Sequence, residues 1–101
     1  PKLMLSTMAR AGATGFLKSL ALEVAADGVT VNSIQPGSHD TERLRSLYGG
    51  DLSRAAADVP MGHVGDADDF GRVAAFLCSE SARFITGAAI PVDGGRWDGL
   101  Q

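Results

Sequence analysis

The feature that most constrains the fold is a helical run that stops at a glycine and continues directly as a β-branched segment. Apolar residues recur at helical spacing from about Ser6 to Ala26. These residues are Phe16, Leu17, Leu20, Ala21 and Val24, and we expect the face that they form to be buried. Asp27-Gly28 then ends the helix, because glycine readily adopts the left-handed conformation found just past a helix end. The segment "VTVNSIQP" follows and predicts a buried strand. Helix, tight turn and strand together indicate an α/β fold.

The second half of the chain repeats the same alternation after a long connection. Residues 37–65 contain one candidate short helix, "TERLRSLY", and otherwise predict a lid, a binding element or a disordered loop. Asp66 is placed to cap a second helix, whose apolar face repeats at helical spacing. That face consists of Phe70, Val73, Ala74 and Leu77. "SESARF" then predicts a single helical turn, and "AAIPV" predicts a strand closed by "DGG".

This order of elements predicts the end of a larger fold. Two strands separated by a helix lie parallel, and a parallel sheet usually has more than two strands with both faces covered. The first residue is Pro rather than Met, and we expect further chain upstream. One domain at most is expected from 101 residues.

Composition excludes several classes of partner. The net charge is -3 and the basic residues are dispersed, so we expect no nucleic-acid partner. No apolar stretch approaches the roughly 20 residues of a membrane span, and the start lacks a signal-peptide pattern. The single Cys78 cannot form an internal disulfide, and we expect it to be buried in an apolar helical run. We therefore expect a soluble, cytoplasmic protein.

Two segments together resemble the C-terminal part of the short-chain dehydrogenase/reductase family. They are "GFLKSLALEVAADGVTVNSIQPG" and "PMGHVGDADDFGRVAAFLCSESARFITGAAIPVDGG". The resemblance implies that residues 1–101 are the C-terminal segment of a Rossmann-type doubly wound parallel sheet. The dinucleotide-binding half of that domain is absent from this chain. It further implies an oxidoreductase that uses NAD or NADP and acts on a small carbonyl or alcohol substrate.

The resemblance places the family's catalytic tyrosine and lysine positions at Ser6 and Arg10, one helical turn apart. A serine hydroxyl is far less acidic than a phenol, so we expect Ser6 at most to hydrogen-bond the substrate or hold a water. Arg10 keeps a cation that can contact the cofactor ribose, although its guanidinium is not equivalent to an ammonium. The alternative is that Ser6 is a helix-entry residue and Arg10 a surface or interface cation.

The turn "QPGSHDT" is the second site that the resemblance implies. In the family this turn passes the nicotinamide end, which implies cofactor contacts at Pro36, Gly37, His39 and Thr41. An ordinary strand-ending turn is the alternative. Neither His39 nor His63 lies in a cluster with metal-ligand spacing, so we expect exposed loop histidines and no metal site.

Two aromatic residues, Tyr48 and Trp97, are weaker candidates for functional contacts. The resemblance makes "TERLRSLYGG" the substrate-covering segment, where Tyr48 could contact a substrate. Trp97 lies where the family often makes subunit contacts, and an exposed tail residue is the alternative. A homodimer or homotetramer is implied.

Three functions remain open. The first is an oxidoreductase with a changed proton-transfer route. The second is a catalytically silent homologue that acts as a scaffold or oligomer partner, motivated by Ser6 and Arg10. The third is a standalone product that dimerises through its exposed helix and sheet edge.

Overall fold

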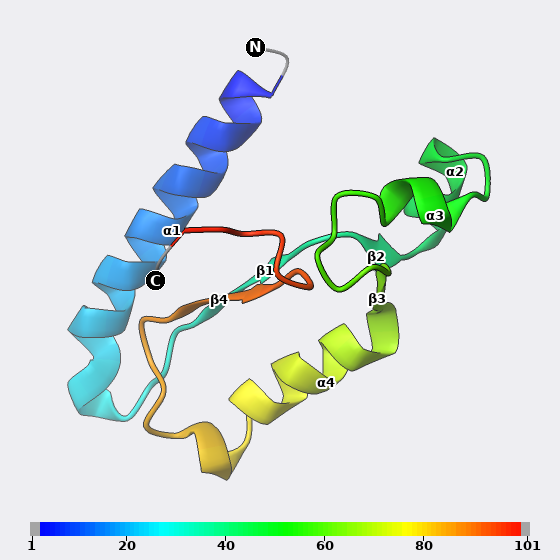
Figure 1. The fold of residues 1–101 in the computed structure, drawn as a ribbon. Coiled ribbons are helices and arrows are strands. Elements are labelled where there is room, and N and C mark those ends of the chain that lie inside the picture. Colours follow the sequence, from blue (N-terminus) through cyan, green and yellow to red (C-terminus); the bar gives the residue numbers. More distant parts are fainter. Residues whose placement is uncertain (1–2, 100–101) are drawn as a thin grey trace. The chain divides into compact units, whose positions relative to one another are not determined.

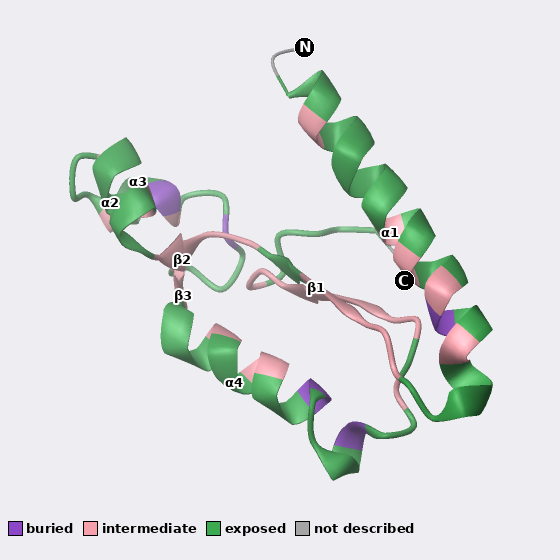
Figure 2. Cartoon of the chain, turned by 180° about the vertical axis from the view of Figure 1, so that it is seen from behind, coloured by how far each residue is buried: buried purple, intermediate pink, exposed green. Residues whose placement is uncertain are grey.

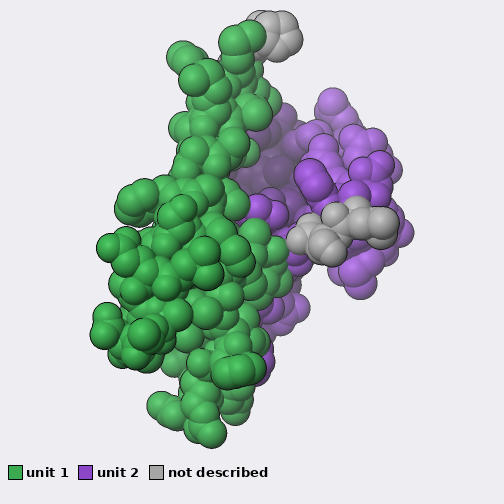
Figure 3. Space-filling model, turned by 90° about the vertical axis from the view of Figure 1, so that its left-hand side faces the viewer, with its two compact units in different colours: residues 1–33, 77–90 green, residues 34–76, 91–101 purple. Residues whose placement is uncertain are grey.

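The computed structural model describes residues 3–99 and divides the chain into two compact units (Figure 3). The first unit comprises residues 1–33 and 77–90, and the second comprises residues 34–76 and 91–101. Helices, short 3-10 turns and strands alternate along the chain (Figure 1). This alternation confirms the predicted α/β class. Within the described residues, no helix is both long and apolar enough to cross a lipid bilayer.

The first unit is built on α1, which spans Met4–Val24 and continues as the 3-10 turn η1, Ala25–Asp27. The helix ends at Gly28, whose φ of 76° lies in the left-handed region. The Gly28 amide donates to the Ala25 carbonyl at 3.0 Å. The predicted helix and its glycine stop are therefore confirmed.

Only part of α1 is covered within its unit (Figure 2). Ala21 is buried, and Leu17, Leu20 and Val24 are half-buried, as predicted. The expectation was wrong for Phe16, which is 66% exposed. A step of about 100° around the helix separates Phe16 from Leu17 and turns it away from the covered face.

The strand predicted over residues 29–36 is shorter than expected, since β1 comprises only Ser33–Pro36. Before it the backbone pairing is incomplete. The Val31 carbonyl accepts from the Gly87 amide at 2.8 Å, but neighbouring groups bond to side chains. The Val31 amide donates to Thr86 Oγ1 at 3.0 Å, and the Asn32 side chain bonds the backbone of residues 85 and 88. These side-chain bonds interrupt the regular pairing that would have extended the strand.

The strand β4, Ala89–Val92, confirms the second predicted strand and pairs with β1 (Figure 1). The Ser33 amide donates to the Ala88 carbonyl at 2.9 Å, and the Gly37 amide donates to the Val92 carbonyl at 3.0 Å. Both partners advance in the same direction, which is the pattern of a parallel pair. The 3-10 turn η2, Glu80–Ala82, confirms the single helical turn predicted before β4.

The second unit contains three helices. They are α2 (Glu42–Leu47), α3 (Leu52–Ala55) and most of α4, which runs over Ala67–Leu77. Asp66 Oδ1 accepts from the Asp68 amide at 2.7 Å and from the Asp69 amide at 3.4 Å, which confirms the predicted cap. Because α4 ends at Leu77, Cys78 falls in the turn that follows and is exposed, so the expected burial of its thiol was wrong.

A two-residue parallel pair in the same unit was not predicted. β2 (His39–Asp40) pairs with β3 (Gly65–Asp66), and His39 is the register partner of Gly65. Strands this short carry no periodicity that a sequence can reveal. The pair joins the end of the strand-ending turn to the start of α4, and it thereby positions the candidate site.

Candidate functional site

The second unit contains a cavity of about 830 Å³, within the usual range of small-molecule sites. All four predicted cofactor residues, Pro36, Gly37, His39 and Thr41, contribute to its lining. Helices α2 and α4 and the segment after β4 supply most of the remaining wall. The residues from these elements that matter below are Arg43, Leu44, Leu47, Phe70, Asp93, Arg96 and Trp97.

The cavity lies at the carboxyl ends of the strands. Its lining begins at Pro36, the last residue of β1, and includes Asp93, which directly follows β4. Ligands of open parallel α/β sheets bind outside this edge, because loops and helix starts converge there. The cavity therefore lies where a parallel α/β sheet of this kind is expected to bind a ligand.

Gly37 is required by packing. A Cβ at this position would lie 2.7 Å from both Cα and Cβ of Asp93, closer than atoms can approach. Its amide donates to Val92, and its carbonyl accepts from the His39 ring. The close approach that only glycine allows is thus made to the neighbouring segment of the chain. This observation favours the simpler interpretation of Gly37 as part of a strand-ending turn.

The His39 ring is fixed on three sides. Its Nδ1 lies 3.1 Å from the Gly37 carbonyl, so Nδ1 carries the proton and donates. The ring meets Phe70 edge to face at 5.0 Å between centroids. It also covers Gly65, where a Cβ would lie 2.7 Å from Nε2. His39 is half-buried, so the expectation of an exposed loop histidine was wrong for it, because this packing encloses the ring.

His63 differs from His39. It is exposed, as expected, and its Nδ1 lies 2.9 Å from the Val64 carbonyl. Among residues 3–99, no group of three or more His, Cys, Asp or Glu side chains is arranged to hold a metal ion.

Thr41 begins α2. Its Oγ1 accepts from the Leu44 amide at 3.2 Å, a typical helix cap. The hydroxyl proton is not used by that bond and can donate to a ligand. Thr41 therefore combines a structural role with a free donor at the cavity wall.

Asp93 organises the segment after β4. Its Oδ1 accepts from the Gly95 amide at 3.0 Å, and its Oδ2 accepts from the Trp97 amide at 2.9 Å. Both carboxylate oxygens are thus engaged in holding the turn that presents Arg96 and Trp97 to the cavity. Sequence reasoning used "DGG" only as the end of a strand and missed this role, although an Asp before two glycines is a recognisable turn signal.

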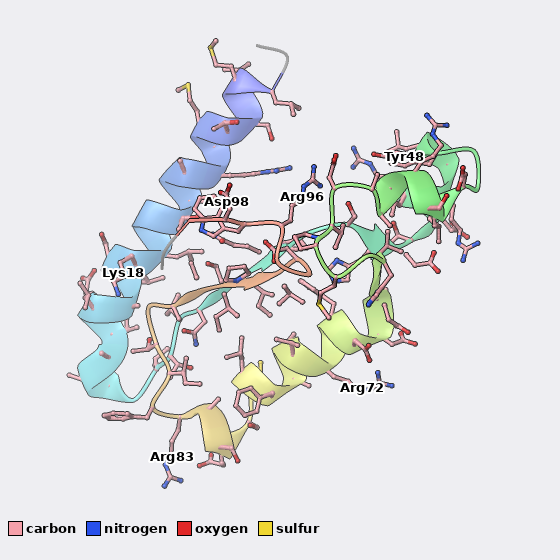
Figure 4. The ribbon with its side chains drawn as sticks, viewed as in Figure 1. Lys18, Tyr48, Arg72, Arg83, Arg96 and Asp98 are labelled. Atoms are coloured by element: carbon pink, nitrogen blue, oxygen red, sulfur yellow. The ribbon has the colours of Figure 1, made fainter. Side chains whose placement is uncertain are left out.

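The arginines of α2 differ in their surroundings. Arg45 makes a bidentate pair with Asp40, with Nε to Oδ1 at 2.6 Å and NH2 to Oδ2 at 2.7 Å. The hydrogen bond from Arg45 holds the pKa of the Asp40 carboxyl below its usual value. Arg43 lines the cavity and has no ion-pair partner among residues 3–99. The same is true of Arg96, labelled in Figure 4.

The two predicted catalytic positions, Ser6 and Arg10, lie on α1 in the first unit. Ser6 is half-buried and Arg10 is exposed. Their four-residue spacing puts both on one face of the helix. Neither side chain makes a hydrogen bond to another described residue, while the Arg10 carbonyl accepts from Thr14 Oγ1 at 2.9 Å.

Tyr48 and Trp97 have different surroundings. Tyr48, labelled in Figure 4, caps the end of α2. The guanidinium carbon of Arg54 lies 5.8 Å from its ring centroid. Tyr48 does not line the cavity, so the suggested substrate contact has no support there. Trp97 is 61% exposed and lines the cavity, a position that the sequence did not predict.

The cavity wall can accommodate the nicotinamide end of a dinucleotide. The Thr41 hydroxyl proton and the His39 Nε2 remain free for an amide group, and Phe70 and Trp97 supply flat apolar surface. The Gly37 amide cannot take part, because it donates to Val92. The lining therefore suits such a group through side chains more than through the backbone of the turn.

The family model that matches this chain and the two relatives given next are all described as reductases. The family model described as enoyl-(acyl carrier protein) reductase matches residues 1–96. The chain is 38% identical over 89 residues to the 3-oxoacyl-(acyl-carrier-protein) reductase of Pseudomonas aeruginosa, covering 88% of this chain and 36% of that protein. It is 43% identical over 90 residues to the acetoacetyl-CoA reductase of Shinella zoogloeoides, covering 88% of this chain and 37% of that protein.

A solved structure shows the same fold. YwfH, described as an NADPH-dependent reductase involved in bacilysin biosynthesis, matches with a TM-score of 0.85 and 31% identity. The match covers 92% of this chain and 39% of YwfH. The chain therefore belongs to the short-chain dehydrogenase/reductase family and has part of its Rossmann-type fold. It spans little more than a third of the length of these relatives.

Proposed function

We propose that this chain is the C-terminal segment of an NAD(P)-dependent oxidoreductase that interconverts a carbonyl and an alcohol. The dinucleotide-binding half is proposed to precede it and complete one Rossmann-type domain. We use "intact protein" below for the two parts together. The fraction of its relatives that the chain spans is consistent with this arrangement.

The observation that carries the proposal is the cavity at the carboxyl ends of the strands. Four residues implied by the family resemblance to contact the cofactor line it together, although they come from the end of β1, a turn, a two-residue strand and a helix cap. The bound dinucleotide would supply or accept the hydride. The residues of the cavity would position its nicotinamide end and the substrate carbonyl.

We assign distinct roles to the cavity residues. The Thr41 hydroxyl donates to the carboxamide of the nicotinamide, since its proton is free in the helix cap. His39 stays fixed by Gly37 and Phe70 and presents Nε2 as an acceptor. Pro36 and Gly37 shape the turn, with Gly37 acting through its contact with Asp93.

The proton route is the unusual feature. Ser6 is too weak an acid to protonate the substrate at neutral pH, so it holds a water that passes a proton to the substrate oxygen and takes one from bulk solvent. Arg10 keeps the cation beside the cofactor ribose. Both roles are proposals from the family register, and the half-buried Ser6 and exposed Arg10 permit them.

The substrate class is proposed only at the level that the relatives share. Two are named for reducing 3-oxoacyl or acetoacetyl groups, and both groups contain a ketone. We therefore propose a ketone substrate.

We also propose an oligomeric state and a location. The apolar side chains exposed along α1, including Leu5 and Met8, support a homodimer or homotetramer. The unpaired thiol of Cys78 fits the reducing cytoplasm.

The test is titration of NADH and of NADPH into the intact protein, followed by cofactor fluorescence. A saturable signal with either cofactor is expected. Thr41→Val should weaken binding about three- to tenfold, because it removes one hydrogen bond. Thr41→Ser, which keeps the hydroxyl, is the matched control. Absence of saturable binding with both cofactors would refute the proposal.

A catalytically silent homologue is the second candidate, and the observation that favours it is the Ser6 and Arg10 pair. A silent protein would keep the fold and a cofactor site without turning over ketones. Cofactor binding without reduction of any ketone tested would support this candidate over the first.

A further inference from the structure

Two cations without an ion-pair partner among the described residues line the cavity, whereas two other arginines of the same unit form ion pairs. Arg45 is bound to Asp40 and Arg72 to Asp69, each at 2.6 Å. Arg43 and Arg96 have no ion-pair partner in the part of the chain that the structure describes. They come from different elements, α2 and the segment after β4, and both line the cavity.

One carboxylate stands against these two cations in the cavity lining, and it forms no ion pair with either of them. Asp93 also lines the cavity, but its two oxygens accept from the amides of Gly95 and Trp97. The wall therefore has a net positive character. An anion brought into the cavity would meet two guanidiniums whose donors are not otherwise used.

Apolar side chains of α2 form part of the remaining wall. Arg43, Leu44 and Leu47 occur at spacings of one, three and four residues, which places Arg43 and both leucines along one side of α2. Phe70 and Trp97 add aromatic surface. The cavity thus combines apolar walls with cations, within the volume of a single small molecule.

We propose that this cavity selects a ketone that carries its own negative charge, such as an oxo acid. The anion is bound by Arg43 and Arg96, and the apolar body packs on the two leucines and Trp97. The inference rests on the proposed function, because it assigns the substrate class of that site. Arg43 and Arg96 are specificity-determining residues in this account.

A cofactor phosphate could supply the same negative charge, so the experiment must separate the two sources. The probes are 4-oxo-4-phenylbutanoate and its methyl ester, which share a ketone and an aromatic body and differ in charge. Binding of each to the intact protein is measured by isothermal titration calorimetry at low and at high salt. NADPH binding is measured in the same variants.

The acid is expected to bind more tightly than the ester, and only its affinity should fall with added salt. Arg43→Gln and Arg96→Gln should each weaken the acid about three- to fivefold and leave the ester unchanged, as expected for exposed charge pairs. Arg72→Gln, which removes an arginine outside the cavity lining, is the matched control and should change neither. Trp97→Ala should weaken acid and ester alike.

Equal affinities for acid and ester, or no binding of either, would overturn the proposal. A loss of NADPH affinity in Arg43→Gln and Arg96→Gln without a loss for the acid would also overturn it, and would assign the two cations to the cofactor. Selective binding of the acid without any cofactor binding would uphold this inference while the proposed oxidoreductase function failed. Cofactor binding together with equal affinities for acid and ester would support the proposed oxidoreductase function and overturn this inference.

Discussion

Two sets of polar side chains, one from each unit, differ in whether they have partners within the chain. In the first unit Asn32 bonds the backbone of residues 85 and 88, and Lys18 Nζ donates to the Gly87 carbonyl at 3.1 Å (Figure 4). In the second unit Arg43 and Arg96 have no ion-pair partner among the described residues, and the Thr41 hydroxyl keeps a free proton. Polar groups that maintain a fold find partners within the chain, whereas groups left free at a cavity wall are available to a ligand.

Two glycines of α1 differ in a similar way from two glycines of the candidate site. Gly12 and Gly15 on α1 have open space where a Cβ would lie. Gly37 and Gly65 allow contacts that no other residue permits, with Asp93 and His39. The closely packed glycines of this comparison thus lie at the candidate site, while Gly12 and Gly15 make no such contact in the described chain.

The largest effect is expected from restoring the family pair on α1. Ser6→Tyr combined with Arg10→Lys should raise the rate of ketone reduction about 10²- to 10⁴-fold in the intact protein, because a positioned general acid contributes that much. Steady-state oxidation of NADPH with a panel of ketones measures it. An unchanged rate would mean that α1 does not supply the reacting proton, even with the family residues present.

The second effect concerns the packing glycine of the site. Gly37→Ala should destabilise the intact protein by roughly 1–3 kcal/mol, because the added methyl overlaps the Asp93 backbone. Urea unfolding measures the change. Gly12→Ala is the control on α1 and should stabilise by roughly 0.5–1 kcal/mol through helix propensity. Equal changes in stability for the two substitutions would contradict the proposed difference in packing between Gly37 and Gly12.

The third effect concerns the internal bonds of the first unit. Asn32→Ala should cost about 1–2 kcal/mol, since it leaves the Ala88 amide and the Ile85 carbonyl unpaired at a half-buried position. Thermal unfolding of the intact protein measures the loss. The control is Thr14→Ala, which removes an exposed bond and should change stability by less than about 0.5 kcal/mol. A neutral Asn32→Ala would contradict the assigned role.

The smallest effect is a pH dependence from the exposed pair of the second unit. The folded pKa of Asp40 lies below its usual 3.8, so the unfolded chain binds this proton first as the pH falls. The stabilisation by the Asp40–Arg45 pair is therefore present above about pH 4 and is lost as the pH falls through the lower folded pKa. Arg45→Gln should be less stable than the parent near neutral pH, and the difference should shrink in acid. Urea unfolding across that range tests this, and a difference independent of pH would contradict it.

Elements with a strong local signal were predicted from the sequence. The periodic apolar residues and the Gly28 stop gave α1, and the acidic start gave the cap of α4. The strand over residues 29–36 was predicted too long, because propensity cannot reveal that Asn32 and Thr86 bond across to the backbone. Contacts between distant segments decided that outcome.

The candidate site was only partly predictable for the same reason. The family resemblance supplied Pro36, Gly37, His39 and Thr41, which the structure brings to one cavity. It supplied neither Arg43 nor Arg96, because their common cavity depends on the turn that Asp93 organises. The enclosure of His39 by Phe70 and Gly65 likewise joins residues far apart in the sequence.

Energy transfer from Trp97 to bound NADPH tests the central claim most directly, because Trp97 is the single tryptophan of this chain and lines the proposed nicotinamide site. Excitation of tryptophan in the intact protein should give saturable NADPH emission. In Trp97→Phe that sensitised emission should fall strongly, while directly excited NADPH still reports binding. Sensitised emission that persists undiminished in Trp97→Phe, or its absence in the parent despite bound NADPH, would place the cofactor elsewhere and contradict the account.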